Sequence, residues 1–165
     1  MMRETLLISA TFLAAVVMGQ ALAHALELPG KMRLNREQYY TVQTIYYPGF
    51  TFGGMAEPLS ILVTGAALLT TPAGSESFFL IAGALVALLL TQLLFWLLVQ
   101  PVNRQWLGSI ELTGAAERFF RTGQTGSASG DWTKLRDRWE RGHVARCVTG
   151  TAAFVLLLLA TASGA

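Results

Sequence analysis

Two histidines, His24 and His143, are the side chains in this chain best suited to proton transfer or metal binding. His24 lies near the end of the first long apolar stretch, and His143 lies at the start of the last one. Ionisable side chains at membrane depth are costly and usually face the interior of a helical bundle. We therefore expect the two rings to lie at one depth and to converge. The alternative is that each ring only forms hydrogen bonds in the headgroup layer.

A second pattern lies in residues 131–147, where aromatic and basic side chains recur at helical spacing. Side chains three or four positions apart share one face of a helix, and here they are Trp132, Arg136, Trp139, His143 and Arg146. Indole rings beside an imidazole and a guanidinium could hold a flat, polarisable ligand and stabilise an anion formed from it. The alternative is a helix end whose Trp and Arg side chains contact lipid headgroups.

Two carboxylates, Glu27 and Glu57, are expected at the same boundary as the histidines and are candidate proton acceptors. Together with His24 and His143 they would be an adequate ligand set for iron, copper or zinc, although their spacing matches no metal-binding motif. The single cysteine, Cys147, excludes an intramolecular disulfide and a CxxC motif. We interpret it as a small packing residue.

The composition that surrounds these residues is that of an integral membrane protein. Of 165 residues, 53% are hydrophobic and 13% are charged, and the mean hydropathy is +0.47. A formal net charge of +2 is small and gives no support for nucleic-acid binding. A membrane helix needs roughly 20 apolar residues, so the chain has room for four. We predict an all-α fold in a single membrane domain, residues 1–165: a four-helix transmembrane bundle with spans at 5–26, 50–71, 78–99 and 143–162.

The second and third spans are joined by a short linker. Its seven residues, 71–77, are rich in turn formers and force the two helices into an antiparallel hairpin. We expect the segment Gly53–Pro58 to be the start of the second span or a break in it, buried among its neighbours. Gln100-Pro101 is predicted to close the third span.

The other two connections are long and are expected to carry short interfacial helices. In residues 27–49, Asn35 is a candidate N-cap for a short aromatic helix. In residues 101–142, an amphipathic piece at 106–120 and a linker rich in Gly and Ser precede a new helix that Asp131 caps.

The distribution of basic residues predicts the orientation. Eleven of the twelve Lys and Arg residues lie in or beside the two long loops, so the positive-inside rule places both loops in the cytoplasm and both termini outside. The competing interpretation is a signal peptide with a cleavage site at Ala21-Leu22-Ala23. Cleavage there would expose His24 as an N-terminal copper ligand. We favour the uncleaved span, because it orients the long third loop more easily.

Two motifs make the chain resemble a known family. Pro101-Val102-Asn103 follows the third span, and the run Leu135-Arg136-x-x-Trp139-x-x-x-His143-x-x-Arg146 enters the fourth. With four spans in this order, the chain is similar to the anthrone-oxygenase-like family of small membrane proteins. Characterised fungal relatives oxidise an anthrone to an anthraquinone with molecular oxygen, apparently without a metal or organic cofactor. Most bacterial members have no assigned activity, and for this chain we expect a bacterial inner membrane.

The resemblance implies an oxygenase that acts on a hydrophobic aromatic or quinonoid molecule. His143 or His24 would be the base that removes a ring-methylene proton, and Arg146 would hold the enolate oxygen. No cofactor is expected; the alternative is a metal ion bound by His24 and His143. The side chains expected to bind substrate are Trp139, Trp132, Arg136, Asn103, Glu57 and Glu27.

A function of another class fits the same pattern. The chain could be a non-catalytic membrane subunit, or a protein that binds a quinone-like small molecule, and could dock a partner through its aromatic and basic cytoplasmic face. Such a role needs no proton transfer. Both the oxygenase and the non-catalytic protein could form a homo-oligomer or belong to a larger membrane complex. A transporter is the least favoured function, because four spans leave little room for a transport pathway.

Overall fold

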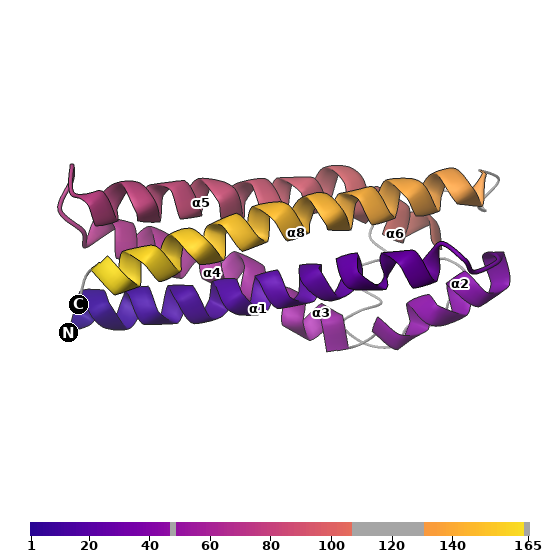
Figure 1. Ribbon diagram of the computed structural model, residues 1–165, viewed down its shortest axis with the longest axis horizontal. Coiled ribbons are helices and arrows are strands. Elements are labelled where there is room, and N and C mark those ends of the chain that lie inside the picture. The colour runs from indigo at the N-terminus through magenta and orange to yellow at the C-terminus, as the bar shows by residue number, and fades with distance from the viewer. Residues whose placement is uncertain (47–48, 107–130, 164–165) are drawn as a thin grey trace.

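The computed structural model describes residues 1–46, 49–106 and 131–163, of which 90% are helical and none lies in a strand. Figure 1 shows long helices packed along one axis, with the N- and C-termini at the same end. The elements are α1 (Met2–Lys31), α2 (Arg36–Gln43), the short 3₁₀ turn η1 (Thr44–Tyr46), α3 (Gly49–Gly54), α4 (Ala56–Leu69), α5 (Glu76–Leu94), the π-helical turn η2 (Phe95–Val99), α6 (Gln100–Trp106) and α8 (Trp132–Ser163).

Four helical segments are long and apolar enough to cross a membrane: Met2–Lys31, Gly49–Leu69, Glu76–Gln105 and Trp132–Ser163. This confirms the predicted all-α bundle of four helices. Three of the expected spans lie inside these segments, and the second extends two residues past the end of α4 at Leu69. The helices are longer than the spans because polar residues at one end of the bundle continue the same helical path.

The bundle core is built from small side chains. Ala10 and Ala14 of α1 meet Ala67, Ala84 and Ala160 of α4, α5 and α8, and all five are fully buried. Small residues let helix backbones approach closely, and within a membrane such van der Waals packing replaces the hydrophobic effect. Large apolar side chains cover the outside of the bundle instead, including Phe12, Leu69 and Phe79.

The hairpin between the second and third spans is confirmed. Gly74 adopts a positive φ of 84°, and Ser75 caps α5 by accepting a hydrogen bond from the Phe78 amide at 3.2 Å. The predicted break before Pro58 is also present, since Met55 separates α3 from α4. A Cβ at Gly53 would lie 2.3 Å from Gln20 Nε2, so glycine lets α3 lie against α1.

The third helix does not end at Gln100-Pro101 as predicted. It widens into the π turn η2 and then continues as α6. Proline lacks the N–H that would bond the Leu97 carbonyl one turn earlier, and Arg138 of α8 donates to that carbonyl at 2.7 Å. An arginine from another helix therefore replaces the lost hydrogen bond and allows the helix to continue.

The predicted short helix capped by Asp131 and the predicted fourth span are one continuous helix, α8. Asp131 accepts hydrogen bonds from the hydroxyl and the amide of Thr133 at 2.6 and 3.0 Å. These bonds hold the pKa of the Asp131 carboxyl below its ordinary value. The amphipathic piece expected at 106–120 lies almost wholly outside the described residues, as does the linker after it.

The first loop forms the expected short helix. Asn35 caps α2 in a reciprocal pair with Gln38, with hydrogen bonds of 3.0 and 3.1 Å. The preceding helix α1 runs past the expected end of the first span and through Pro29 to Lys31. Figure 1 shows α2 beside the end of the bundle where α8 begins, and α3 nearer the middle of its length.

A testable consequence concerns Gly142, where α8 packs against η2. A Cβ there would lie 2.9 Å from Val99 Cγ2 and 3.1 Å from Leu98 Cβ. We expect Gly142→Ala to destabilise the protein by about 1–3 kcal/mol, as overpacking does. The measurement is the thermal unfolding midpoint in detergent, followed by circular dichroism. Gly65→Ala is the control, because a Cβ at Gly65 meets nothing within 4 Å; equal midpoints for the two variants would refute this account of the packing.

Candidate functional site

A pocket of about 560 Å³ lies where the four long helical segments and the turn η1 come together, and its lining comes from α1, η1, α3, α4, α5, η2, α6 and α8. This volume lies within the range of small-molecule sites. Six of the nine side chains singled out from the sequence line it: His24, Glu57, Asn103, Trp139, His143 and Arg146. Residues from the two ends of the chain thus meet in one cavity.

The two histidines meet inside this pocket. Their ring centroids are 4.1 Å apart, and both residues are about 5% exposed. Trp139 packs on both rings, with centroid distances of 4.1 Å to His143 and 5.1 Å to His24. The two rings therefore converge as expected, and the Trp139 indole of α8 packs against both of them.

The rest of the wall is aromatic and apolar. Tyr46 of η1 and Phe50 of α3 lie 4.5 and 4.8 Å from the His24 ring, measured between centroids. Phe95 and Val99 of η2 line the pocket from another helix. Sequence reasoning missed Phe50 and Phe95, because aromatic residues inside apolar spans are indistinguishable from lipid-facing ones by pattern alone.

Arg146 connects the histidines to the acidic side of the pocket. One guanidinium nitrogen lies 3.3 Å from Nδ1 of His143, and another forms an ion pair with Glu57 of α4. With the Gln92 amide oriented to satisfy both of its ends, its nitrogen donates to Glu57 at 2.7 Å and its oxygen accepts from Trp96 at 2.9 Å. The guanidinium is thus held in place by a carboxylate that is itself hydrogen-bonded.

Asn103 has a positioning role in this structure. Its side-chain oxygen accepts a hydrogen bond from the Trp139 indole at 2.8 Å, and its amide nitrogen donates to Gln100 at 3.4 Å. Both the oxygen and the nitrogen of the Asn103 side-chain amide therefore have hydrogen-bond partners within the protein. This arrangement fixes the plane of the indole that packs on the two histidines.

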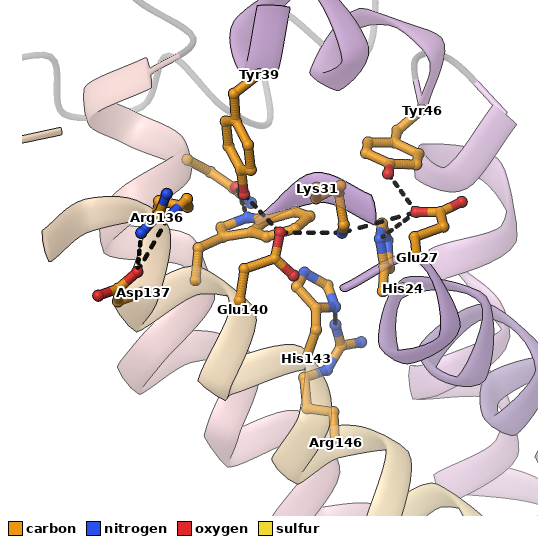
Figure 2. A network of polar contacts seen from close by, with 12 residues as sticks. His24, Glu27, Lys31, Tyr39, Tyr46, Arg136, Asp137, Glu140, His143 and Arg146 are labelled. Atoms are coloured by element: carbon orange, nitrogen blue, oxygen red, sulfur yellow. Dashed lines mark hydrogen bonds and ion pairs between the residues drawn. The ribbon is translucent and has the colours of Figure 1, made fainter. Parts of the chain in front are cut away.

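A second polar group lies behind the histidines, toward the end of the bundle, and is here named the carboxylate cluster: Glu27, Lys31, Tyr39, Tyr46 and Glu140. Lys31 Nζ lies 3.0 Å from Glu140 and 3.7 Å from Glu27. Tyr39 donates to Glu140 at 2.6 Å, and Tyr46 donates to Glu27. Figure 2 shows these contacts forming a continuous chain from Tyr39 to His24.

The carboxylate cluster was not identified from the sequence, although a signal existed. Lys31 was counted only among the basic residues of the first loop, and Glu140 was given no role, yet they are only 3% and 2% exposed. His24, Glu27 and Lys31 are spaced by three and four residues, so they share one face of a helix, and Glu140 lies three residues before His143. Extending both helical faces by one turn would have found them.

The other three predicted side chains do not line the pocket. Trp132 packs against Tyr39 at a centroid distance of 6.2 Å, and Arg136 lies over the Trp132 ring at 5.1 Å while pairing with Asp137 at 2.8 Å. Glu27 belongs to the carboxylate cluster. The helical face predicted from residues 131–147 is therefore divided, since its first two turns pack on α2 and only its later turns reach the cavity.

No group of three or more His, Cys, Asp and Glu side chains is arranged to hold a metal ion among the residues that the structure describes. The two histidines are close, but Glu57 pairs with Arg146 and Glu27 lies nearer to Lys31 and Tyr46. A metal site here would thus require a ligand set in which these pairs are rearranged.

Four helices apolar enough to cross a membrane, with two histidines at the wall of an aromatic pocket between them, are the architecture of a small membrane protein. Residues 43–156, more than half of the chain, match the family described as anthrone oxygenase. The chain therefore belongs to the anthrone oxygenase family, as its motifs indicated. The search of curated proteins found no match, and no solved structure matches either.

The burial of Lys31 gives a stability prediction. Lys31→Met would leave Glu140 and Glu27 without their shared cation, and an unpaired buried charge costs about 3–5 kcal/mol. Adding Glu140→Gln should recover part of this loss, because Tyr39 can still donate to the amide oxygen. The measurement is the unfolding midpoint of each variant in detergent.

Lys134→Met is the control for this experiment, since the Lys134 side chain is 85% exposed. We expect its midpoint to match that of the unaltered protein. A Lys31→Met variant as stable as Lys134→Met would show that the buried ion pair is not a stabilising element.

Proposed function

We propose that this protein is a membrane-embedded oxygenase that oxidises a hydrophobic aromatic or quinonoid molecule of the anthrone type without a metal or organic cofactor. The observation that carries the proposal is the pair of buried histidines at the wall of a 560 Å³ aromatic pocket, with Arg146 beside them. Family membership supports the same class of activity. The proposal includes the bilayer as the site of action, with the long loops in the cytoplasm.

The proposed oxidation of an anthrone needs molecular oxygen as its only co-substrate. A base removes one proton from the ring methylene, and the resulting enolate is electron-rich enough to reduce molecular oxygen. The new C–O bond gives a hydroperoxide once the proton returns, and loss of water from the hydroperoxide leaves the quinone carbonyl. Anthrone and one O₂ thus give anthraquinone and one water.

His24 is the better candidate for the base. Because an arginine can only donate, the contact of Arg146 with His143 assigns the lone pair to Nδ1 of His143 and the proton to Nε2. On His24, Nδ1 faces Glu27 at 3.8 Å, which favours a proton on Nδ1 and leaves Nε2 as the free lone pair. His143 would hold Arg146 and the His24 ring in place.

Arg146 would stabilise the enolate. A fixed cation aimed at developing negative charge is the strongest single contribution to this kind of step. Trp139, Phe50 and Phe95 would pack on the flat rings of the substrate. Enclosure by these groups excludes water from the enolate.

The outer side of the pocket suits a substrate that arrives from the lipid. Phe52, Met55 and Trp96 line the pocket, yet they are 67%, 67% and 45% exposed on the flank of the bundle. This flank lies on helices apolar enough to be within the membrane. A hydrophobic tricyclic molecule dissolved in the bilayer would therefore enter between α3 and η2 without crossing water.

One observation favours a second candidate, a quinone-binding subunit without catalysis. Arg146 is already neutralised by Glu57, and a pocket whose cation is already paired suits a neutral ligand as well as an anion. In that case the outer face formed by Trp132 and Arg136 would dock a partner. The two candidates differ in whether the bound molecule is turned over.

The test is oxygen-dependent conversion of an anthrone to its quinone by the purified, chelator-treated protein, corrected for spontaneous oxidation. We expect His24→Ala to lower the rate by a factor of about 100 or more, as loss of general-base catalysis does. His143→Ala should also lower it, because Arg146 and the His24 ring lose a group that holds them in place. Arg136→Gln is the control and should retain the rate, because Arg136 lies outside the pocket. Full activity in both histidine variants would contradict the proposed mechanism.

The remaining outcomes separate the alternatives. Activity that is lost on chelation and restored by iron, copper or zinc would favour a metal held by His24 and His143. Tight binding of a quinone without turnover, together with loss of partner association in Arg136→Gln, would favour the binding subunit.

A further inference from the structure

Glu27 and His24 are neighbours on one face of α1. Glu27 lies one helical turn later on α1, and its carboxylate is 3.8 Å from Nδ1 of the His24 ring. The histidine side chain is 6% exposed, whereas that of Glu27 is 38% exposed. The carboxylate thus lies on the Nδ1 side of the ring, beyond hydrogen-bond distance, and also reaches the surface.

Two neighbours hold the Glu27 carboxylate where it is. Tyr46 donates a hydrogen bond to Oε2, and Lys31 Nζ lies 3.7 Å from the same oxygen. Lys31 is in turn fixed by Glu140 at 3.0 Å and by the Trp139 ring, whose centroid is 4.8 Å away. Glu27 is therefore oriented by groups from η1 and α8 as well as from its own helix.

The tyrosines of the carboxylate cluster serve as fixed hydrogen-bond donors. Burial raises the pKa of the Tyr39 hydroxyl, and the neighbouring Glu140 carboxylate raises it further. Burial and the hydrogen bond to Glu27 likewise raise the pKa of Tyr46. Both hydroxyls keep their protons, so neither competes with His24 for the proton taken from the substrate.

The charges around His24 are not balanced while its ring is neutral. The carboxylate cluster has two carboxylates, Glu27 and Glu140, and one ammonium, Lys31. The nearby Arg146 is already paired with Glu57. When His24 takes a proton, the positive charge forms beside the Glu27 carboxylate, which opposes the cost of an uncompensated buried charge.

We infer that Glu27 is the positioning residue for His24: it fixes the ring with Nε2 toward the substrate and stabilises the imidazolium formed when His24 takes the substrate proton. This inference rests on the proposed function. In the step itself, the C–H bond of the ring methylene breaks, its electron pair stays on the substrate as the enolate, and the proton goes to His24 Nε2. The 3.8 Å separation would shorten as the ring becomes charged, as catalytic hydrogen bonds do on complex formation.

The test isolates proton removal from oxidation. Under anaerobic conditions in D₂O, anthrone cannot be oxidised, so incorporation of deuterium at its ring methylene, followed by NMR, reports deprotonation alone. We expect Glu27→Gln to lower the protein-dependent exchange rate at least about tenfold, since a misplaced catalytic group loses this much or more. Glu27→Asp keeps a carboxylate and should recover most of the loss.

Anthrone affinity is measured in the same samples by quenching of tryptophan fluorescence. A positioning role predicts a dissociation constant for Glu27→Gln within about twofold of the unaltered protein, whereas a distorted pocket would weaken binding in parallel with the rate. Glu37→Gln is the matched control, because Glu37 is an exposed acid on α2 outside the carboxylate cluster. Its exchange rate and affinity should be unchanged.

These measurements tell a failure of the Glu27 positioning role apart from a failure of the proposed function. If the unaltered protein gives no exchange above the protein-free rate, both the base chemistry and the role of Glu27 are overturned. If the unaltered protein accelerates exchange and Glu27→Gln does so equally well, only the positioning role is overturned. A parallel loss of affinity and rate in both Glu27→Gln and Glu27→Asp would also overturn it, in favour of a structural role.

Discussion

The ammonium group of Lys31, buried between Glu27 and Glu140, is the interaction on which the arrangement of the site depends. It joins the end of α1 to the start of α8 in a region where the alanine-rich packing of the bundle core is absent. Through Tyr39 and Tyr46 the same charges also bind α2 and η1. Because buried charges must be paired, these elements are confined to one relative placement. His24 and His143 are brought together as a result.

Two kinds of interaction therefore hold the helices together, one at each end of the bundle. At the end that holds the termini, small side chains such as Ala10 and Ala160 permit close contact between helices that have little specific chemistry. At the other end, charges and aromatic rings keep the helices far enough apart to leave a pocket. The π turn η2 contributes to the opening, since a wider helical turn displaces Phe95 and Val99 and such turns are frequent at functional sites.

Much of this architecture follows from the sequence, because apolar length and helical spacing are local properties. The meeting of His24 with His143 could be anticipated from their places at the ends of two antiparallel spans. Helical spacing also puts Lys31 on the face of His24 and Glu140 on the face of His143, but the direct contact between Lys31 and Glu140 depends on how α1 is rotated against α8. Pro101 was read as a helix end for a related reason: Arg138, which satisfies the Leu97 carbonyl, comes from a distant part of the chain. The division of the 131–147 face between α2 and the pocket likewise depends on tertiary packing.

The length of α8 has a consequence for where chemistry can take place relative to the lipid. Its 32 residues extend roughly 48 Å at 1.5 Å per residue, whereas the hydrocarbon core of a bilayer is about 30 Å thick. The apolar residues after His143 are enough to fill that thickness, so the polar turns before it extend into the headgroup zone. His143 then lies at the boundary of the two phases. A molecule in the pocket would then lie at this boundary, with Arg146 about one helical turn nearer the acyl chains and Trp139 about one turn nearer the headgroups.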